Sequence, residues 1–202
     1  MKIADLKKIL KVFLTLQWAK ELPRQGFIAM GFKRNEADSV AAHSFSTALL
    51  GYFLASNLKK SGVKINPDKV LKMGLVHDIG ETIVGDVGTF VKGMAGGVFK
   101  NIEEEGVRAL LGDLDCKDEI IDLVEEYNQR KSIEARVVKA SDNLDAFAQA
   151  KGVPAAADGL KYFKRVYHLT NLDWHKKAVD LIMSGEVEPE REWQSDRRKK
   201  QL

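Results

Sequence analysis

The sequence predicts an all-α fold, a helical bundle formed by a single domain. Apolar residues recur at spacings of three and four along most of the 202 residues, and the alternation typical of β-strands is absent. Hydrophobic residues make up 45% of the chain, which is enough for a core, and neither a repeat nor a linker separates two cores. We therefore expect one folded domain over residues 1–185 and a flexible C-terminal tail over residues 186–202.

Helix start and stop signals divide the domain into segments. The expected helices span approximately residues 3–22, 39–58, 66–80, 100–111, 117–130, 133–151, 154–169 and 174–183. Ser39 is a suitable N-cap, and Asn66 followed by Pro67 and Asp68 is a strong helix start. A Gly- and charge-rich loop is expected over 23–38, and a mobile connection with at most short helical turns over 85–97.

The charge distribution argues against a nucleic-acid partner. The net charge is +3, and the segment Arg191–Leu202 alone accounts for it, with five basic and two acidic residues. A nucleic-acid binder is expected to carry its positive charge on a folded surface instead.

The N-terminus and the single cysteine indicate where the protein resides. Cys116 cannot form an internal disulfide, which favours a reducing compartment. Lysines interrupt the N-terminal apolar residues, so no signal peptide is predicted, and no apolar stretch approaches the roughly 18 residues of a membrane span. We expect a cytoplasmic protein with no membrane partner.

Four polar residues occupy positions that should face the core. His43 falls on the apolar stripe of the helix expected over 39–58, and His77 and Asp78 end the helix that begins near Asn66. Asp142 lies in the most apolar helix of the C-terminal half. A carboxylate inside a core is costly unless it is paired or bound to a metal.

Each of these residues also has an ordinary interpretation. His43 alone would more often be a hydrogen-bonded core histidine, and Asp142 a salt-bridged acid with Arg136 or Lys139 as partner. Together, two imidazoles and two carboxylates form a ligand set for one divalent ion with one or two positions open, which is typical of a catalytic metal. Mixed ligands of this kind suit manganese, cobalt, iron, nickel or zinc.

Two further acids follow the His77-Asp78 pair. Glu81 should project from the same side of the turn as His77, and Asp86 begins the glycine-rich connection. Neither is needed as a ligand, so both are available for proton transfer or for orienting a water. A solvated helix-end acid and a turn-capping acid are the alternative interpretations.

These residues form the pattern of the HD superfamily of metal-dependent phosphohydrolases. The chain resembles in particular the 5'-deoxynucleotidases together with the related HD-domain-containing-protein-2-like group. The segments that carry the resemblance are LPR at 22–24, DSVAAHS at 38–44, HDIGETIVGDVGTFVK at 77–92 and KASDNLDAFAQA at 139–150. They are distributed over most of residues 1–170. Membership of this family would imply an HD-type helical bundle, and the resemblance also implies a homodimer.

The resemblance also implies roles for individual residues. It implies that His43, His77, Asp78 and Asp142 hold the metal, that Glu81 and Asp86 handle protons and water, and that Arg24 grips the substrate phosphate. Lys92 is a candidate for a second phosphate contact, with a surface lysine as the alternative. The two acids are not distinguished from each other.

Two departures from the family pattern affect what can be expected. The family usually has an acid before the first histidine, where this chain has Ala42, so a carboxylate behind His43 must come from elsewhere. Bacterial members have Trp after the phosphate-binding arginine, where this chain has Gln25, so a preference for deoxy over ribo substrates does not follow.

The function expected from the sequence is removal of the 5'-phosphate from nucleoside monophosphates. A divalent ion lowers the pKa of a bound water and neutralises phosphoryl oxygens, and Arg24 could hold two of those oxygens in its planar fork. The alternatives are another HD-type reaction, such as triphosphohydrolase or phosphodiesterase activity, and a non-catalytic, metal-stabilised scaffold that binds nucleotide.

Overall fold

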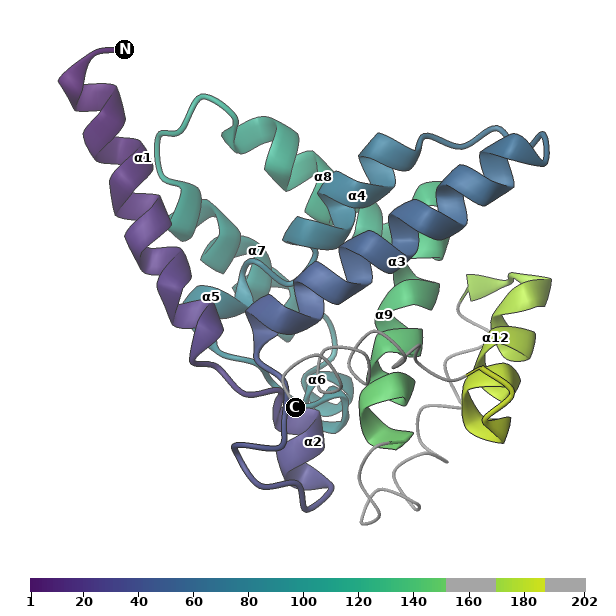
Figure 1. Cartoon of the computed structure of the whole chain (residues 1–202). Coiled ribbons are helices and arrows are strands. Elements are labelled where there is room, and N and C mark those ends of the chain that lie inside the picture. The colour runs from purple at the N-terminus through teal and green to yellow at the C-terminus, as the bar shows by residue number, and fades with distance from the viewer. Residues whose placement is uncertain (152–169, 188–202) are drawn as a thin grey trace, which may run out of the picture.

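The computed structural model describes residues 1–151 and 170–187 and has one helical domain (Figure 1). Over these residues there is no β-sheet, which agrees with the all-α prediction. The helices in chain order are α1 (Ile3–Leu16), η1 (Gln17–Lys20, a 3-10 helix), α2 (Gln25–Ala29), α3 (Val40–Lys60), α4 (Pro67–Val76), α5 (Glu81–Val84), α6 (Thr89–Ala95), α7 (Gly97–Leu111), α8 (Lys117–Gln129), α9 (Ile133–Lys151) and α12 (Asp173–Ser184). Among the described residues no helix is long and apolar enough to cross a membrane.

Both predicted helix starts are confirmed in atomic detail. The hydroxyl of Ser39 accepts a hydrogen bond from the backbone N–H of Ala42 at 3.2 Å. The side-chain oxygen of Asn66 accepts from the backbone N–H groups of Asp68 and Lys69. Local sequence therefore determines where α3 and α4 begin.

The connections contain more helix than the sequence predicts. The expected loop 23–38 includes α2, because Phe27 and Phe32 pack against Ala146 and Ala150 of α9 and stabilise a five-residue helix through tertiary contacts. The connection 85–97 includes α6, and α4 stops at Val76, four residues before the expected end. The helix expected over 154–169 lies outside the described residues, as does most of the expected tail.

The central core lies where α3, α4 and α9 meet. It is formed by fully buried residues such as Ala55, Val70 and Met73 together with Val137 and Val138. A second apolar cluster joins α1 to α7 and α8, and Figure 1 shows α1 along one edge of the bundle and α12 beside α9 at the other. The three central helices thus form the framework that carries the polar residues.

A close approach between α3 and α4 depends on Gly74. A β-carbon at Gly74 would lie 2.6 Å from the Cα of Ala48, well inside contact distance. The absence of a side chain therefore lets α4 pack backbone to backbone against α3. Because Gly74 is three residues from His77, this contact fixes where the end of α4 lies relative to α3.

An isolated antiparallel bridge between Pro23 and Ser39 closes the loop that precedes α3. The backbone N–H of Arg24 donates to the backbone carbonyl of Asp38 at 2.8 Å, and that of Val40 donates to the backbone carbonyl of Leu22 at 2.9 Å. The bridge holds Arg24 next to the start of α3.

Candidate active site

Three helical segments bring the predicted histidines and aspartates together. His43 lies on α3, His77 and Asp78 lie in the turn after α4, and Asp142 lies on α9. His43, His77 and Asp142 are only 1%, 5% and 7% exposed, and each offers one ligand atom within 4.8 Å of the other two. The interior positions predicted from the apolar stripes are therefore confirmed.

Asp78 lies beside this group. Its Oδ2 is 3.2 Å from Nε2 of His77 and 3.8 Å from Nε2 of His43. Burial alone would raise the pKa of Asp78, but His77 and Arg24 outweigh burial and hold it well below its usual range. Asp78 is thus an ionised carboxylate that faces both imidazoles.

Asp142 uses its two oxygens differently. Lys139 and the hydroxyl of Tyr127 donate to Oδ2 at 2.6 and 2.8 Å, whereas Oδ1 lies 3.3 Å from Nε2 of His43. Burial would raise the pKa of Asp142, but Lys139 and His43 hold it well below the usual value. The salt bridge to Lys139 considered from the sequence is present, and it leaves Oδ1 directed at the histidines.

Arg24 is surrounded by carboxylates. Its guanidinium lies 3.5 Å from Asp78, 3.7 Å from Asp86 and 4.0 Å from Asp142. Burial opposes its charge, but Asp78, Asp142 and Asp86 more than compensate, so the pKa of Arg24 is raised. The guanidinium therefore stays charged beside the histidine-aspartate group.

Glu81 lies at the start of α5 and is buried. Its Oε1 accepts from the Nζ of Lys92 at 2.9 Å, and its Oε2 has no hydrogen-bond partner among the described residues. Burial and the charge of Asp78 raise the pKa of Glu81 well above its usual value, against the opposing effect of Lys92. Lys92 also pairs with Glu103 at 2.6 Å, so it is not a free surface lysine.

Asp86 ties the glycine-rich connection to the loop before α3. Its Oδ2 accepts the backbone N–H of Gln25 at 2.6 Å in addition to facing Arg24. In this arrangement Asp86 holds the segment that carries Arg24.

With this geometry established, comparison with known proteins identifies the family. The model of the HD domain matches residues 17–179, which include every residue of the candidate site described above. The chain belongs to the HD-domain family.

Named relatives and a solved structure with a similar fold match the chain as well. The chain is 34% identical over 136 residues to the 5'-deoxynucleotidase HDDC2 of Dictyostelium discoideum, covering 65% of this chain and 70% of that protein. It is 31% identical over 133 residues to the 5'-deoxynucleotidase HDDC2 of Danio rerio, of which the match spans only 62%. A conserved hypothetical protein from Pyrococcus furiosus superposes with a TM-score of 0.71 at 28% identity, covering 87% of this chain and 97% of that one.

HD domains are metal-dependent, and the buried side chains of this one fit a divalent cation. Nε2 of His43 and Nε2 of His77 are both buried, and neither has a hydrogen-bond partner among the described residues. A buried polar atom without a partner costs about 1–3 kcal/mol, so two of them side by side and next to carboxylates need an explanation. A cation between them would satisfy both lone pairs.

The far nitrogen of each imidazole is anchored differently. Nδ1 of His77 hydrogen-bonds to the backbone oxygen of Gly74 at 2.8 Å, and Nδ1 of His43 to Oδ2 of Asp145 at 2.6 Å. The sequence analysis missed Asp145, although it lies three residues after Asp142 and therefore on the same face of α9. Tyr127 was also missed, since it has the pattern of an ordinary core residue.

Proposed function

We propose that this HD domain is a metal-dependent phosphohydrolase that removes the 5'-phosphate from deoxyribo- or ribonucleoside monophosphates. The observation that carries the proposal is the pair of buried, unpartnered Nε2 atoms of His43 and His77 beside two ionised aspartates and a charged arginine. The names of the relatives, 5'-deoxynucleotidases, support the choice of substrate.

The metal would be held by His43, His77, Asp78 and Asp142. When bound, a divalent ion supplies a water of lowered pKa and neutralises charge on the phosphoryl oxygens. The ligand set of two imidazoles and two carboxylates is compatible with manganese, cobalt, iron, nickel or zinc.

Arg24 would bind the substrate phosphate. Its Nη1 lies 3.5 Å from Asp78 but is buried without a hydrogen bond among the described residues, so its N–H groups can still donate to a ligand. A planar guanidinium can donate to two oxygens of one phosphate. The three carboxylates around Arg24 keep it in place and in its charged form before substrate arrives.

Glu81 and Asp86 would divide the proton chemistry and the positioning. The raised pKa of Glu81 favours its protonated form, which would deliver a proton to the leaving 5'-oxygen. Asp86 would position Arg24 through Gln25 and orient a water. Lys92 would contact the phosphate only after releasing Glu81 or Glu103, and until then it holds Glu81 in position.

Phosphate release after metal removal and re-addition tests this function. The chelated protein should be inactive on deoxyribo- and ribonucleoside 5'-monophosphates and regain activity with individual divalent ions. Asp78→Ala should abolish both metal binding and turnover, whereas Arg24→Ala should weaken substrate binding and leave metal content unchanged. Activity on triphosphates or cyclic nucleotides alone, or metal-dependent stabilisation with no phosphate release, would favour the alternative reactions or a binding scaffold.

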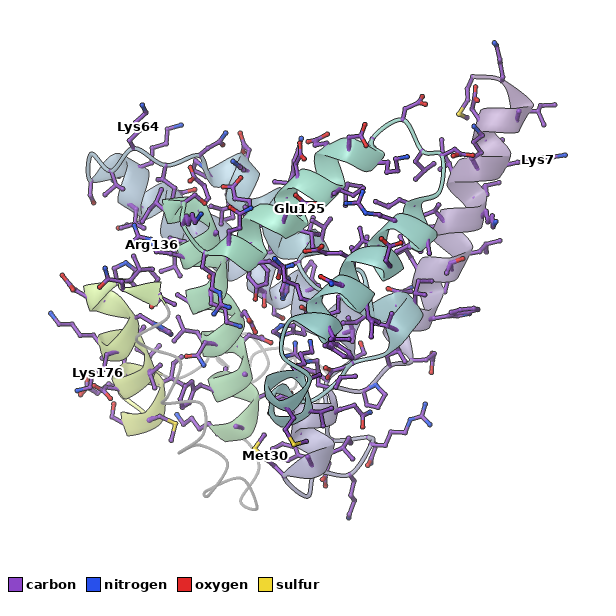
Figure 2. All side chains as sticks on the ribbon, turned by 180° about the vertical axis from the view of Figure 1, so that it is seen from behind. Lys7, Met30, Lys64, Glu125, Arg136 and Lys176 are labelled. Carbon is purple, nitrogen blue, oxygen red and sulfur yellow. The ribbon has the colours of Figure 1, made fainter. Side chains whose placement is uncertain are left out.

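We further propose that the protein acts as a homodimer in the cytoplasm and that a second copy covers α1. The apolar face of α1, formed by Ile3, Leu6, Leu10, Phe13 and Leu14, is at least 37% exposed at every position. α1 carries three lysines and one aspartate, whereas residues 97–129 hold ten acidic and three basic residues. Figure 2 shows Lys7 projecting away from the bundle at this edge. An exposed apolar face favours self-association, and the lysines of α1 would meet acidic residues of the segment 97–129 in a second copy.

The α1 interface can be tested by light scattering. Leu10→Glu should convert a wild-type dimer to a monomer, while Leu181→Glu, at a leucine of similar exposure on α12, should leave the mass unchanged. A monomeric wild-type protein, or one whose α1 binds anionic vesicles instead, would contradict the homodimer.

A further inference from the structure

We infer that Asp145 is a positioning residue that orients His43 toward the metal. This inference rests on the proposed metal site. It goes beyond that site by assigning a role to a residue that would not itself bind the metal. His43 Nδ1 and Asp145 Oδ2 are 2.6 Å apart, and the two residues are 102 positions apart in the chain. The contact joins α3 to α9.

The chemistry of the pair fixes which nitrogen of His43 carries the proton. A carboxylate oxygen accepts hydrogen bonds, so we assign Nδ1 of His43 as the donor in the 2.6 Å contact to Oδ2 of Asp145. In the neutral imidazole the lone pair is then on Nε2, the atom that lies 3.3 Å from Oδ1 of Asp142 and 3.8 Å from Oδ2 of Asp78. Asp145 thus selects the tautomer in which His43 can bind a cation.

The second imidazole provides an internal comparison. His77 is held in the same tautomer by the backbone oxygen of Gly74, within its own segment. That contact is supplied by the helix itself, whereas the contact to His43 depends on one side chain from another helix. His43 is therefore the ligand whose orientation can be lost by a single substitution.

The order of charged residues along α9 explains how this helix directs the carboxylate of Asp142 toward the histidines. Lys139, Asp142 and Asp145 follow at intervals of three, so they share one face of α9. Lys139 donates a hydrogen bond to Oδ2 of Asp142, and Asp145 hydrogen-bonds to Nδ1 of His43. One helix face therefore directs Oδ1 of Asp142 and Nε2 of His43 toward each other.

Metal affinity and histidine tautomer, measured on metal-free protein, test the inference. Asp145→Leu removes the acceptor, Asp145→Asn keeps a neutral acceptor of the same shape, and Asp145→Glu should partly rescue. The matched control is Glu134→Gln, since Glu134 lies on the same helix and accepts the backbone N–H of Asn66 at 2.9 Å, away from the site.

Calorimetric titration with Mn²⁺ should show binding weakened about 10- to 100-fold in Asp145→Leu, with a smaller loss in Asp145→Asn and no change in Glu134→Gln. Long-range ¹⁵N–¹H NMR spectra of the metal-free protein should assign the proton of His43 to Nδ1 in wild type and show loss of that preference in Asp145→Leu. If Asp145→Leu does not fold, Asp145→Asn decides the question.

The inference is overturned if wild type and folded Asp145→Leu bind Mn²⁺ within a factor of three, or if the tautomer of His43 is unchanged in that variant. A variant that loses thermal stability but not metal affinity would make the contact purely structural, which also overturns it. Wild-type protein that binds no divalent ion would refute the proposed function itself, so the two failures are distinguishable.

Discussion

Replacing Gly74 by alanine tests whether the close approach of α3 and α4 determines the geometry of the site. The new β-carbon would lie 2.6 Å from the Cα of Ala48, 3.0 Å from its Cβ and 3.1 Å from its backbone nitrogen. Carbon atoms in contact are about 3.5–4.0 Å apart, so α4 must move by about 1 Å. The atoms met are mainly backbone, which cannot turn aside as a side chain could.

The magnitude follows from two opposing terms. Overpacking of this kind costs about 1–3 kcal/mol, and a contact with backbone belongs at the upper end. Alanine in place of glycine within a helix returns about 1 kcal/mol. We expect a net loss of about 2 kcal/mol in the free energy of unfolding, measured by urea denaturation. Because His77 and Asp78 follow directly on α4, a displacement of about 1 Å should also lower phosphate release about 100-fold.

A second glycine provides the control. Gly93 lies within α6, and a β-carbon there would meet no described heavy atom within 4 Å. Gly93→Ala should therefore stabilise the protein by about 0.5–1 kcal/mol. Gly74→Ala protein with wild-type stability, metal affinity and turnover would show that the close contact does not set the site.

Three further predictions concern buried polar groups. Burial lowers the pKa of His175 to about 4, so the unfolded protein binds more protons than the folded protein below pH 6.5. The free energy of unfolding should therefore fall by about 3 kcal/mol as the pH drops from 6.5 to 4. Urea unfolding at both pH values should show a smaller fall in His175→Gln, and an equal fall would refute this prediction. Tyr127→Phe removes the hydroxyl that donates to Asp142, so it should cost about 1 kcal/mol of stability, measured by denaturation. Metal affinity, measured by calorimetry, should fall several-fold, and unchanged affinity would show that the hydroxyl does not support the site. Lys92→Met removes the cation that lowers the pKa of Glu81, so the limb of the pH–rate profile controlled by Glu81 should move to higher pH. A shift to lower pH would contradict the assignment of that limb to Glu81.

Periodicity was sufficient to place the interior polar residues. His43 lies on an apolar stripe, and Asp142 lies among core residues of α9, so their burial follows from the 3.6-residue repeat. The starts of α3 and α4 follow from Ser39 and Asn66, because capping is a local interaction between a side chain and the next few backbone N–H groups.

Short helices within connections were beyond local reasoning. α2 has five residues, too few to be stable alone, and depends on Phe27 and Phe32 packing against α9. The sequence of 23–38 shows glycine and charge, and nothing in it identifies α9 as the surface that Phe27 will meet.

The sequence by itself determines which residues are buried on a helix, through the helical repeat, and where a helix begins, through its cap. Which atoms meet at the site was decided by tertiary structure: that Asp145 reaches His43, that Tyr127 donates to one oxygen of Asp142, and that Lys92 lies between two glutamates. The physical reason is that such contacts depend on the rotation and spacing of packed helices, which are set by side-chain volume at distant positions such as Gly74.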